Sequence, residues 1–542
     1  MFNLPVIGVA AGIALLCLIA SHLRTRRKPF PPGPPGSPIL GNLLQIPTKK
    51  ACLKFQQWSH EYGSSSNGLL GLRLGPWARF IVLNKHKQIR DLLEGRSTIY
   101  AGRGHVAIME KIRAWTKPGE PYVGNFASWQ YNDELKRERR ASHEYMLRSG
   151  QVEKLLPIQD AESTQLMWEL LSFERDQKAA GAAGAAPGAH HIFFFRTFGA
   201  VVLAAVYGIR GKDSAPNSPL AKFESLVKEF IQLLALTAAP PYEVFPFVDY
   251  IPEFINPWQG WIVRGKQFGI RWFLFWKEFH QIALDSAERK TSREGDGVLL
   301  KLQGKGYSET EKLSFGSTMM NGGADTTAIT CLTMIGALIN NPDIQQQARA
   351  EVDAIFGEGV LPTADKLNQL PFVKACFYEA VRWRPLTPLM TRRVRQDHEY
   401  EGFFIPKDTM VLFNIWALSH DTDVFERPQD FMPSRYLPQC RGDPEAKAKP
   451  LPVYGFGTGL RNCPGQKMAE YSVMLVIAKL LWAFEISSPD GKLDTSMETG
   501  YDDAFMLAPN PARLSFRLRS QVRGDILQRE WKKADEWLAR FE

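Results

Sequence analysis

Residues 456–465 read Phe456-Gly457-Thr458-Gly459-Leu460-Arg461-Asn462-Cys463-Pro464-Gly465. This stretch is the most informative in the sequence, because a phenylalanine, two glycines, an arginine and a cysteine stand at fixed spacing around a tight turn. Glycine permits backbone conformations and close approaches that other residues do not, and arginine offers a planar fork of donors for a carboxylate. The residues from Gln466 onward are typical of a helix. Cys463 is therefore expected just before a helix N-terminus, a position that lowers the pKa of a thiol.

Read alone, this window has a simpler interpretation, a buried free cysteine in a glycine-rich turn. The spacing F-x-x-G-x-R-x-C-x-G matches in full, however, and it resembles the cysteine-ligand loop of the cytochrome P450 family of heme-thiolate monooxygenases. The resemblance implies heme b as the cofactor, with Cys463 as the axial ligand and metal-binding residue. A thiolate there donates electron density to iron and favours O–O cleavage. Phe456 is expected beside the sulfur, Gly459 and Gly465 against the macrocycle, and Arg461 at a heme propionate.

A second motif, Asn321-Gly322-Gly323-Ala324-Asp325-Thr326-Thr327, falls inside a helix predicted over roughly residues 309–340. Each glycine inside a helix costs about 1 kcal/mol, so either a tight helix crossing or a local bulge is expected here. The resemblance favours the bulge, because the motif matches the family's acid–alcohol pair beside a slot for O2. Asp325 and Thr326 are then the catalytic residues that deliver protons to reduced oxygen.

A third motif is structural. Glu379 and Arg382 stand three residues apart and share one face of a predicted helix. The pair resembles the family's E-x-x-R, which a later arginine joins. Arg435 occupies that later place, with Ser434 where the family usually has an acid. A carboxylate held between two guanidinium groups tolerates burial because it is paired, so this cluster is expected to support the cysteine loop from behind.

Two further arginines are expected at the heme propionates by resemblance. Arg139 lies in the basic helical stretch 135–143, which is similar to the family's W-x-x-x-R helix except that Leu135 replaces the tryptophan. The other arginine is Arg392 or Arg393, in the segment that follows the E-x-x-R helix, and we assign Arg393.

The N-terminus predicts a membrane anchor. Residues 1–23 are almost entirely apolar and carry no charge apart from a protonated His22, and about 20 such residues span a ~30 Å hydrocarbon core. Basic residues follow within the basic, proline-rich hinge over 24–36, and positive charge stays on the cytoplasmic side. The alternative is a cleaved signal peptide, but the segment lacks a positive start and a small-residue cleavage site. By resemblance to microsomal members, we expect a single-pass protein of the endoplasmic reticulum membrane with its catalytic domain in the cytosol.

The rest of the chain predicts a mainly α fold with small β-sheets, as the cytochrome P450 resemblance also implies. Short alternating segments at 69–74 and 80–83 indicate strands, and the catalytic domain is expected over 37–520. The low-complexity stretch 179–189 indicates a surface loop, and 521–542 an amphipathic C-terminal extension.

Composition sets limits on function. The chain has 542 residues, 44% of them hydrophobic and 23% charged, which is a globular composition. The net charge of +9 favours acidic partners or an anionic membrane surface, and no basic run with interleaved aromatic residues indicates nucleic-acid binding. The six cysteines are scattered without a C-x-x-C pair, so neither a zinc site nor a disulfide framework is indicated. This pattern suits a reducing compartment.

The principal hypothesis is a heme-thiolate monooxygenase that uses O2 to hydroxylate, epoxidise or repeatedly oxidise a small apolar substrate. The resemblance implies electrons from NADPH through NADPH–cytochrome P450 reductase, with cytochrome b5 as an additional donor, and membrane lipid as a further partner. The pattern is most similar to fungal members that make secondary metabolites. Two alternatives are an O2-independent isomerase or dehydratase, which tends to lose the acid–alcohol pair, and a non-enzymatic heme sensor. Residues 101–126 and 501–509 are expected to line the substrate pocket, but they do not specify a molecule.

Overall fold

The computed structural model describes residues 29–104, 124–179, 185–213, 215, 218–234, 245, 248, 250–289, 297–440, 451–502 and 506–542. The predicted anchor over 1–23 lies outside these residues, as do residues 24–28 of the hinge, most of the 101–126 segment and the centre of the low-complexity stretch. The chain divides into two compact units. Unit 1 comprises residues up to 47, 51–104 and 389–414, and unit 2 comprises 48–50, 105–388 and 415–542.

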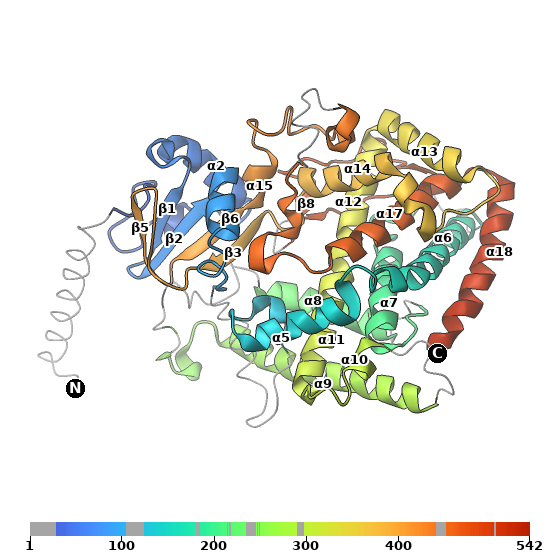
Figure 1. Ribbon diagram of the computed structural model, residues 1–542, viewed down its shortest axis with the longest axis horizontal. Coiled ribbons are helices and arrows are strands. Elements are labelled where there is room, and N and C mark those ends of the chain that lie inside the picture. Colours follow the sequence, from blue (N-terminus) through green and yellow to red (C-terminus); the bar gives the residue numbers. More distant parts are fainter. Residues whose placement is uncertain are drawn as a thin grey trace, which may run out of the picture. The chain divides into compact units, whose positions relative to one another are not determined.

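Unit 1 is built on a four-stranded sheet in the order β1-β2-β6-β3 (Figure 1). Its strands are β1 (Leu70–Leu74), β2 (Ala78–Leu83), β3 (Leu389–Arg393) and β6 (Met410–Asn414). β1 and β2 form an antiparallel hairpin, β2 pairs with β6 in parallel, and β3 is antiparallel to β6. Helix α2 (Ala51–Tyr62) packs on β1 and β6, and a second hairpin joins β4 (His398–Tyr400) to β5 (Phe403–Ile405). The two strands predicted near residue 70 and residue 80 are confirmed.

Unit 2 is almost entirely helical, as predicted. Among the described residues, its α-helices of more than five residues are α5 (Asp133–Ser142), α6 (Leu156–Ala179), α7 (His191–Tyr207), α8 (Pro219–Leu234), α9 (Gln259–Arg289), α11 (Glu309–Gly323), α12 (Asp325–Asn340), α13 (Pro342–Phe356), α14 (Pro371–Trp383), α17 (Gln466–Ala483) and α18 (Gln521–Leu538). Shorter α-helices within the described residues are α3 (His86–Gln88, in unit 1), α10 (Val298–Lys301) and α15 (Ile415–Ser419). Two small antiparallel pairs complete unit 2: β7 (Phe484–Ser487) with β10 (Ser515–Leu518), and β8 (Tyr501–Asp502) with β9 (Ala508–Pro509).

Two hydrophobic clusters hold unit 2 together. One gathers apolar side chains of α7, α9 and α11 and includes Ala324 and Met468. The other lies among α6, α12, α13, α14 and α17, and it buries α17 continuously from Val473 to Ala483. Apart from Lys479, which pairs with the Asp160 carboxylate at 2.6 Å, this part of α17 is apolar all round, as suits the interior of a large domain. The start of α17, just after the cysteine loop, is thereby fixed by the core.

The predicted long helix over 309–340 is present but interrupted. α11 ends at Gly323 and α12 begins at Asp325, with Ala324 between them at φ −79° and ψ −73°. By length and composition Glu309–Asn340 is the one described helix that could cross a membrane, yet 61% of its most apolar window is buried inside the protein. We treat it as a core helix.

The C-terminal segment forms α18, which packs along α6 (Figure 1). The Trp531 indole stacks on Trp168 with ring centroids 4.6 Å apart. Leu527 and Leu538 are fully buried, and Arg523 binds the Asp353 carboxylate of α13 at 3.1 Å. This segment is thus an amphipathic helix, as predicted, whose apolar face packs against unit 2.

Candidate functional site

The loop over 456–465 is closed by one backbone hydrogen bond, in which the Cys463 N–H donates to the Phe456 carbonyl at 2.7 Å. Gly457 and Gly459 have φ of +71° and +62°, a region in which non-glycine residues are strained. Gly465 follows and precedes α17 as its N-cap. A Cβ built on Gly465 would stand 3.9 Å from the Cys463 sulfur, so this glycine leaves the thiol uncovered on that side.

Two observations describe the surroundings of the Cys463 thiol. Its side chain is accessible to solvent, yet burial among surrounding protein atoms is the main influence on its pKa and raises it. A sulfur with both properties lies at the inner wall of a recess. The N–H groups of Gly465 and Gln466, and the Arg139 guanidinium, favour the thiolate. The sequence-based expectation of a lowered pKa is therefore wrong in net direction, because burial outweighs the helix N-terminus in the chain alone.

Two arginines converge on this loop. The Arg139 Nη2 of α5 donates to both the backbone and the side-chain oxygen of Asn462, each at 3.1 Å. Burial lowers the pKa of Arg139, and the neighbouring Cys463 opposes that shift. Arg461 is buried within the loop, and its Nη2 donates to the Trp129 carbonyl at 2.7 Å. The loop thus carries two guanidinium groups from elements far apart in sequence.

Arg393 lies in unit 1, whereas the other assigned residues lie in unit 2. It stands in β3, where its Nε pairs with the Asp408 carboxylate at 3.0 Å and its backbone N–H donates to Gly102 at 2.9 Å. Asp408 has φ of +68°, a conformation that glycine adopts more readily than aspartate. The role of Arg393 at a propionate stays a prediction.

At the break between α11 and α12, one glycine serves a tight helix crossing and the other leaves an open face, so both interpretations drawn from the sequence apply. A Cβ on Gly323 would come within 2.5 Å of Val202 on α7, which makes Gly323 a helix-crossing residue. Gly322 is exposed, and nothing lies within 4 Å of where its Cβ would stand. The Thr326 hydroxyl donates to the Gly322 carbonyl at 2.6 Å, so it lies on the open side of the break.

Asp325 faces a histidine that the sequence did not reveal. Its Oδ1 lies 3.9 Å from Nε2 of His191, whose Nδ1 lies 3.6 Å from Oε1 of Glu224. Burial raises the pKa of Asp325, and the Glu224 charge raises it further, whereas His191 and Lys228 act against the shift. No local motif marks His191 or Glu224, because they lie on α7 and α8, more than a hundred residues before Asp325. Only the tertiary fold brings them together.

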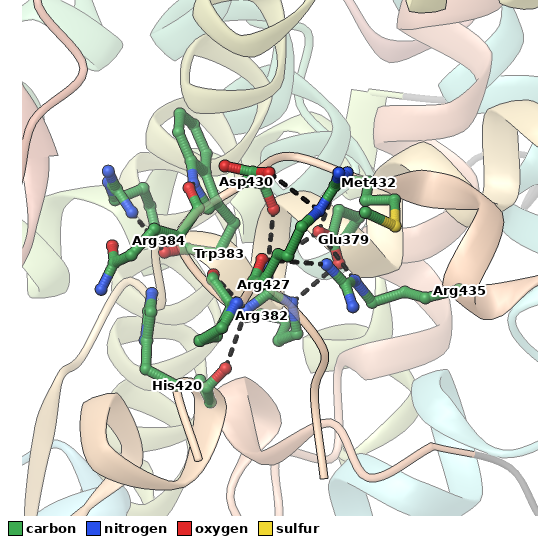
Figure 2. Close-up of polar contacts among 12 residues, drawn as sticks. Glu379, Arg382, Trp383, Arg384, His420, Arg427, Asp430, Met432 and Arg435 are labelled. Carbon is green, nitrogen blue, oxygen red and sulfur yellow. Dashed lines mark hydrogen bonds and ion pairs between the residues drawn. The ribbon is translucent and has the colours of Figure 1, made fainter. Parts of the chain in front are cut away.

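The predicted Glu379 cluster is confirmed (Figure 2). Arg382 binds Glu379 with two hydrogen bonds, Nη2 to Oε1 at 2.7 Å and Nε to Oε2 at 2.8 Å, and Arg435 Nε reaches Oε1 at 3.1 Å. The Met432 N–H donates to the same oxygen at 2.8 Å. Glu379 and Arg382 are fully buried.

Helix α14, which carries this cluster, adjoins the cysteine loop. A Cβ on Gly455 would come within 2.4 Å of Val381, and the Phe456 ring lies 6.1 Å from Phe377. The cluster therefore supports the loop from behind, as expected.

The residues present fit a heme held by a single thiolate. The recessed thiol supplies one soft ligand, and a coordinating thiol is deprotonated by the metal whatever its pKa in the free chain. Arg139 and Arg461 offer donors for carboxylates, which is the polar requirement of a heme. The open face at Gly322 is lined by a hydroxyl and borders the cluster that contains Ala324 and Met468. Unit 2 therefore supplies a thiolate ligand, positively charged partners for the propionates and apolar side chains suited to the macrocycle.

Comparison with known proteins agrees with this assignment. The profile of the Cytochrome P450 family matches residues 31–516. Cytochrome P450 monooxygenase yanC of Aspergillus niger is 31% identical, over 97% of this chain and 96% of its own length. Cytochrome P450 monooxygenase macC of Penicillium terrestre is 30% identical over 97% of both chains, and acuD of Aspergillus aculeatus is 29% identical over 99% and 97%. The chain is an oxidoreductase with heme bound through a cysteine thiolate, and it belongs to the cytochrome P450 family of monooxygenases.

Proposed function

We propose that this monooxygenase inserts one oxygen atom of O2 into a small apolar compound of fungal secondary metabolism. The observation that carries the proposal is the Asp325–Thr326 pair at the break between α11 and α12, with the open face of Gly322 beside it. Reductive activation of O2 needs protons at one oxygen, and a carboxyl followed by a hydroxyl supplies a route for them. The relatives named above are all fungal monooxygenases, which supports the metabolic setting.

Each residue of the site then has one task. Cys463 ligates the iron, and Arg139, Arg461 and Arg393 bind the propionates. Phe456 excludes water from the sulfur, while Gly459 and Gly465 leave room for the macrocycle. When bound, heme supplies the centre at which O2 binds and is reduced; Thr326 and Asp325 hold and pass protons at that face.

The redox partner and the setting are part of the same proposal. Electrons come from NADPH through NADPH–cytochrome P450 reductase, with cytochrome b5 as an additional donor. Residues 1–23 anchor the chain in the endoplasmic reticulum membrane with the catalytic domain in the cytosol, as the apolar run and the basic residues after it indicate.

The acid–alcohol pair also separates this function from its alternatives. An isomerase or dehydratase that rearranges an already oxidised substrate needs no proton delivery to O2, and neither does a heme sensor. Asp325 and Thr326 are both present, and the helix is open at that point. The monooxygenase is therefore the favoured function.

The test is O2 uptake by the purified, detergent-solubilised full chain in the presence of NADPH and a fungal NADPH–cytochrome P450 reductase. We expect uptake that requires both, together with a thiolate-type carbon monoxide spectrum of the reduced protein. A thiolate spectrum without reductase-dependent uptake would favour the O2-independent enzyme or the sensor.

Cys463→Ser tests the ligand. A serine oxygen is a harder and less donating ligand than a thiolate, so we expect any heme that remains bound to lose the thiolate-type spectrum with carbon monoxide. Cys440→Ser is the matched control, because Cys440 is an exposed free cysteine and its replacement should leave the spectrum unchanged. Retention of the spectrum in Cys463→Ser would show that another residue is the ligand.

A further inference from the structure

One imidazole in unit 2 lies between two carboxyl groups from different helices. His191 is the first residue of α7, Glu224 comes from α8 and Asp325 begins α12. The ring presents Nδ1 to Glu224 at 3.6 Å and Nε2 to Asp325 at 3.9 Å. Separations of this size are spanned by a bridging water or by a small side-chain rotation. The two ring nitrogens thus face different carboxylates, as a proton relay requires.

Lys228 is the most exposed of these side chains. It is 65% exposed and binds the Glu224 carboxylate at 2.7 Å one helical turn away. In the order of their contacts, the side chains of Glu224, His191 and Asp325 are 11%, 34% and 14% exposed. Because Glu224 is held by a solvent-facing ammonium group, one end of the series is in contact with bulk water. The other end is the carboxyl beside Thr326.

The ring has two acidic neighbours. Among the described residues, His191 contacts Glu224 of α8 and Asp325 of α12, and Lys228 of α8 binds Glu224. On its own helix the ring stacks on Phe195, with centroids 6.2 Å apart and planes 25° from parallel. This contact orients the imidazole edge toward the two carboxyl groups. Asp325 is also the group whose pKa burial raises, so it holds a proton more readily than an exposed aspartate.

We propose that His191 and Glu224 are positioning residues that resupply protons from solvent to Asp325. In each transfer a proton moves from the Glu224 carboxyl to Nδ1 of His191 while the proton on Nε2 passes to Asp325. The Nε2–H bond breaks, the Nδ1–H bond forms, and the ring stays neutral in its other tautomer. A flip of the imidazole then turns the Nδ1–H toward Asp325 and the unprotonated Nε2 toward Glu224, and Glu224 regains its proton from water. The next transfer runs with the two ring nitrogens exchanged. The inference rests on the proposed role of Asp325 and Thr326.

The test needs no knowledge of the substrate. In substrate-free turnover with reductase, O2 takes up two electrons and two protons to give hydrogen peroxide, or four electrons and four protons to give two waters. Slower proton supply favours early release of peroxide. We expect His191→Gln and Glu224→Gln each to lower the yield of water relative to peroxide by roughly tenfold, so NADPH consumed per O2 falls from near two toward one.

The matched control is Glu229→Gln, because Glu229 is also on α8 and pairs with Arg271 outside the relay. It should keep the wild-type stoichiometry. A structural role for His191 would not change the pH profile. We therefore also expect the water yield of wild type to depend on pH and that of His191→Gln to be nearly independent of it.

A second readout does not use turnover. The infrared carbonyl band that Asp325→Asn removes reports the protonation of Asp325 in the resting protein. We expect its titration midpoint to rise in His191→Gln, because His191 lowers the pKa of Asp325, and to fall in Glu224→Gln, because Glu224 raises it. Unchanged midpoints in both variants would overturn the assignment of these partners.

The outcomes separate the two levels of the proposal. If Thr326→Ala releases peroxide while His191→Gln and Glu224→Gln behave as wild type, the relay is wrong and the acid–alcohol pair stands. If wild type shows no reductase-dependent O2 uptake, the proposed function itself fails.

Discussion

The Thr326 hydroxyl illustrates how one side chain serves structure and chemistry together. It donates to the Gly322 carbonyl at 2.6 Å, next to the point at which the helix is interrupted. Threonine often bonds the carbonyl four residues earlier, and this bond tends to bend a helix. One turn later, Thr330 makes the same contact with the Thr326 carbonyl at 2.8 Å. Thr326 and Thr330 on α12 therefore make the same kind of hydrogen bond, but only Thr326 lies beside the exposed Gly322.

This pairing gives a controlled test of proton delivery. We expect Thr326→Ala to keep its fold and accept electrons, because alanine is a good helix former. The reduced oxygen should then leave as hydrogen peroxide, so peroxide per NADPH rises severalfold. Thr330→Ala loses the same backbone contact and should leave the stoichiometry as in wild type. Equal peroxide yields in the two variants would assign Thr326 a structural role only.

Glu138 is a second residue with an unusual setting. It lies on the buried face of α5 beside Leu135, one residue before Arg139, and is fully buried. Neither carboxylate oxygen has a hydrogen-bond partner among the described residues. Burial, with the charges of Glu311 and Glu134, raises the pKa of Glu138 to about 8, against an ordinary value of 4.5. The folded protein therefore favours the neutral acid.

The sign of the resulting pH dependence follows from linkage. Between about pH 4.5 and about 8 the folded state binds a proton that the unfolded state releases, so the free energy of unfolding falls as pH rises through this window. Each unit of pKa difference corresponds to about 1.4 kcal/mol. Glu138→Gln removes this slope, and we expect it to gain stability relative to wild type between about pH 6 and about pH 9. Urea midpoints measured at both pH values check this, with Glu144→Gln as control, because Glu144 is exposed and is not among the charges that shift the pKa of Glu138.

At the scale of elements, helix α14 connects the interior to the cysteine loop. Glu379 on this helix is bound by Arg382 and Arg435 and has no access to solvent. Arg382 also donates to the carbonyls of Ser419 and Pro428, at 2.8 Å and 2.9 Å. The cluster therefore joins α14 to the long segment that leads to Cys463 (Figure 2).

Removing the Glu379 side chain leaves the guanidinium groups of Arg382 and Arg435 without their counter-charge. We expect Glu379→Ala to lose about 3–5 kcal/mol, a large share of a typical total of ~5–15 kcal/mol, with little heme-loaded protein recovered. Asp430→Ala is the matched control, because Asp430 and Arg427 form an exposed pair at the same three-residue spacing and such pairs contribute about 0–1 kcal/mol. Urea unfolding and heme content measure both. A Glu379→Ala protein that is stable and heme-loaded yet inactive would indicate a catalytic role.

The elements also show what the sequence could and could not predict. Strands β1 and β2 were predictable because they pair with each other across a short turn. The parallel neighbour β6 was not, since more than 300 residues separate Phe80 from its partner Met410. The Glu379–Arg382 pair was predictable from helical spacing, whereas the His191–Asp325 contact has no local signal. Sequence motifs reveal groups that are close together in the chain. The burial that raises the pKa of Cys463 depends on residues from the whole fold, so no local motif predicts it.

Over the whole molecule, the anchor predicted at residues 1–23 precedes the part of the chain that the structure describes. The described part begins at Pro29, whose carbonyl accepts a hydrogen bond from the Phe404 N–H at 2.8 Å within unit 1. Unit 1 also exposes three large apolar side chains, Ile39, Leu44 and Trp77. We expect these side chains to contact lipid independently of residues 1–23.

Deletion of residues 1–28 tests the anchor and keeps the Pro29 contact. We expect the shortened chain to bind heme as wild type does and to be released from membranes by alkaline carbonate, because it has lost its predicted spanning segment. Residual binding to anionic vesicles should persist and should fall when Ile39, Leu44 and Trp77 are changed to serine, since exposed apolar side chains and net positive charge both favour that surface. Carbonate-resistant attachment of the shortened chain would contradict the anchor. So would N-terminal sequencing of the wild-type microsomal protein that shows cleavage after the apolar run, because that is the behaviour of a signal peptide.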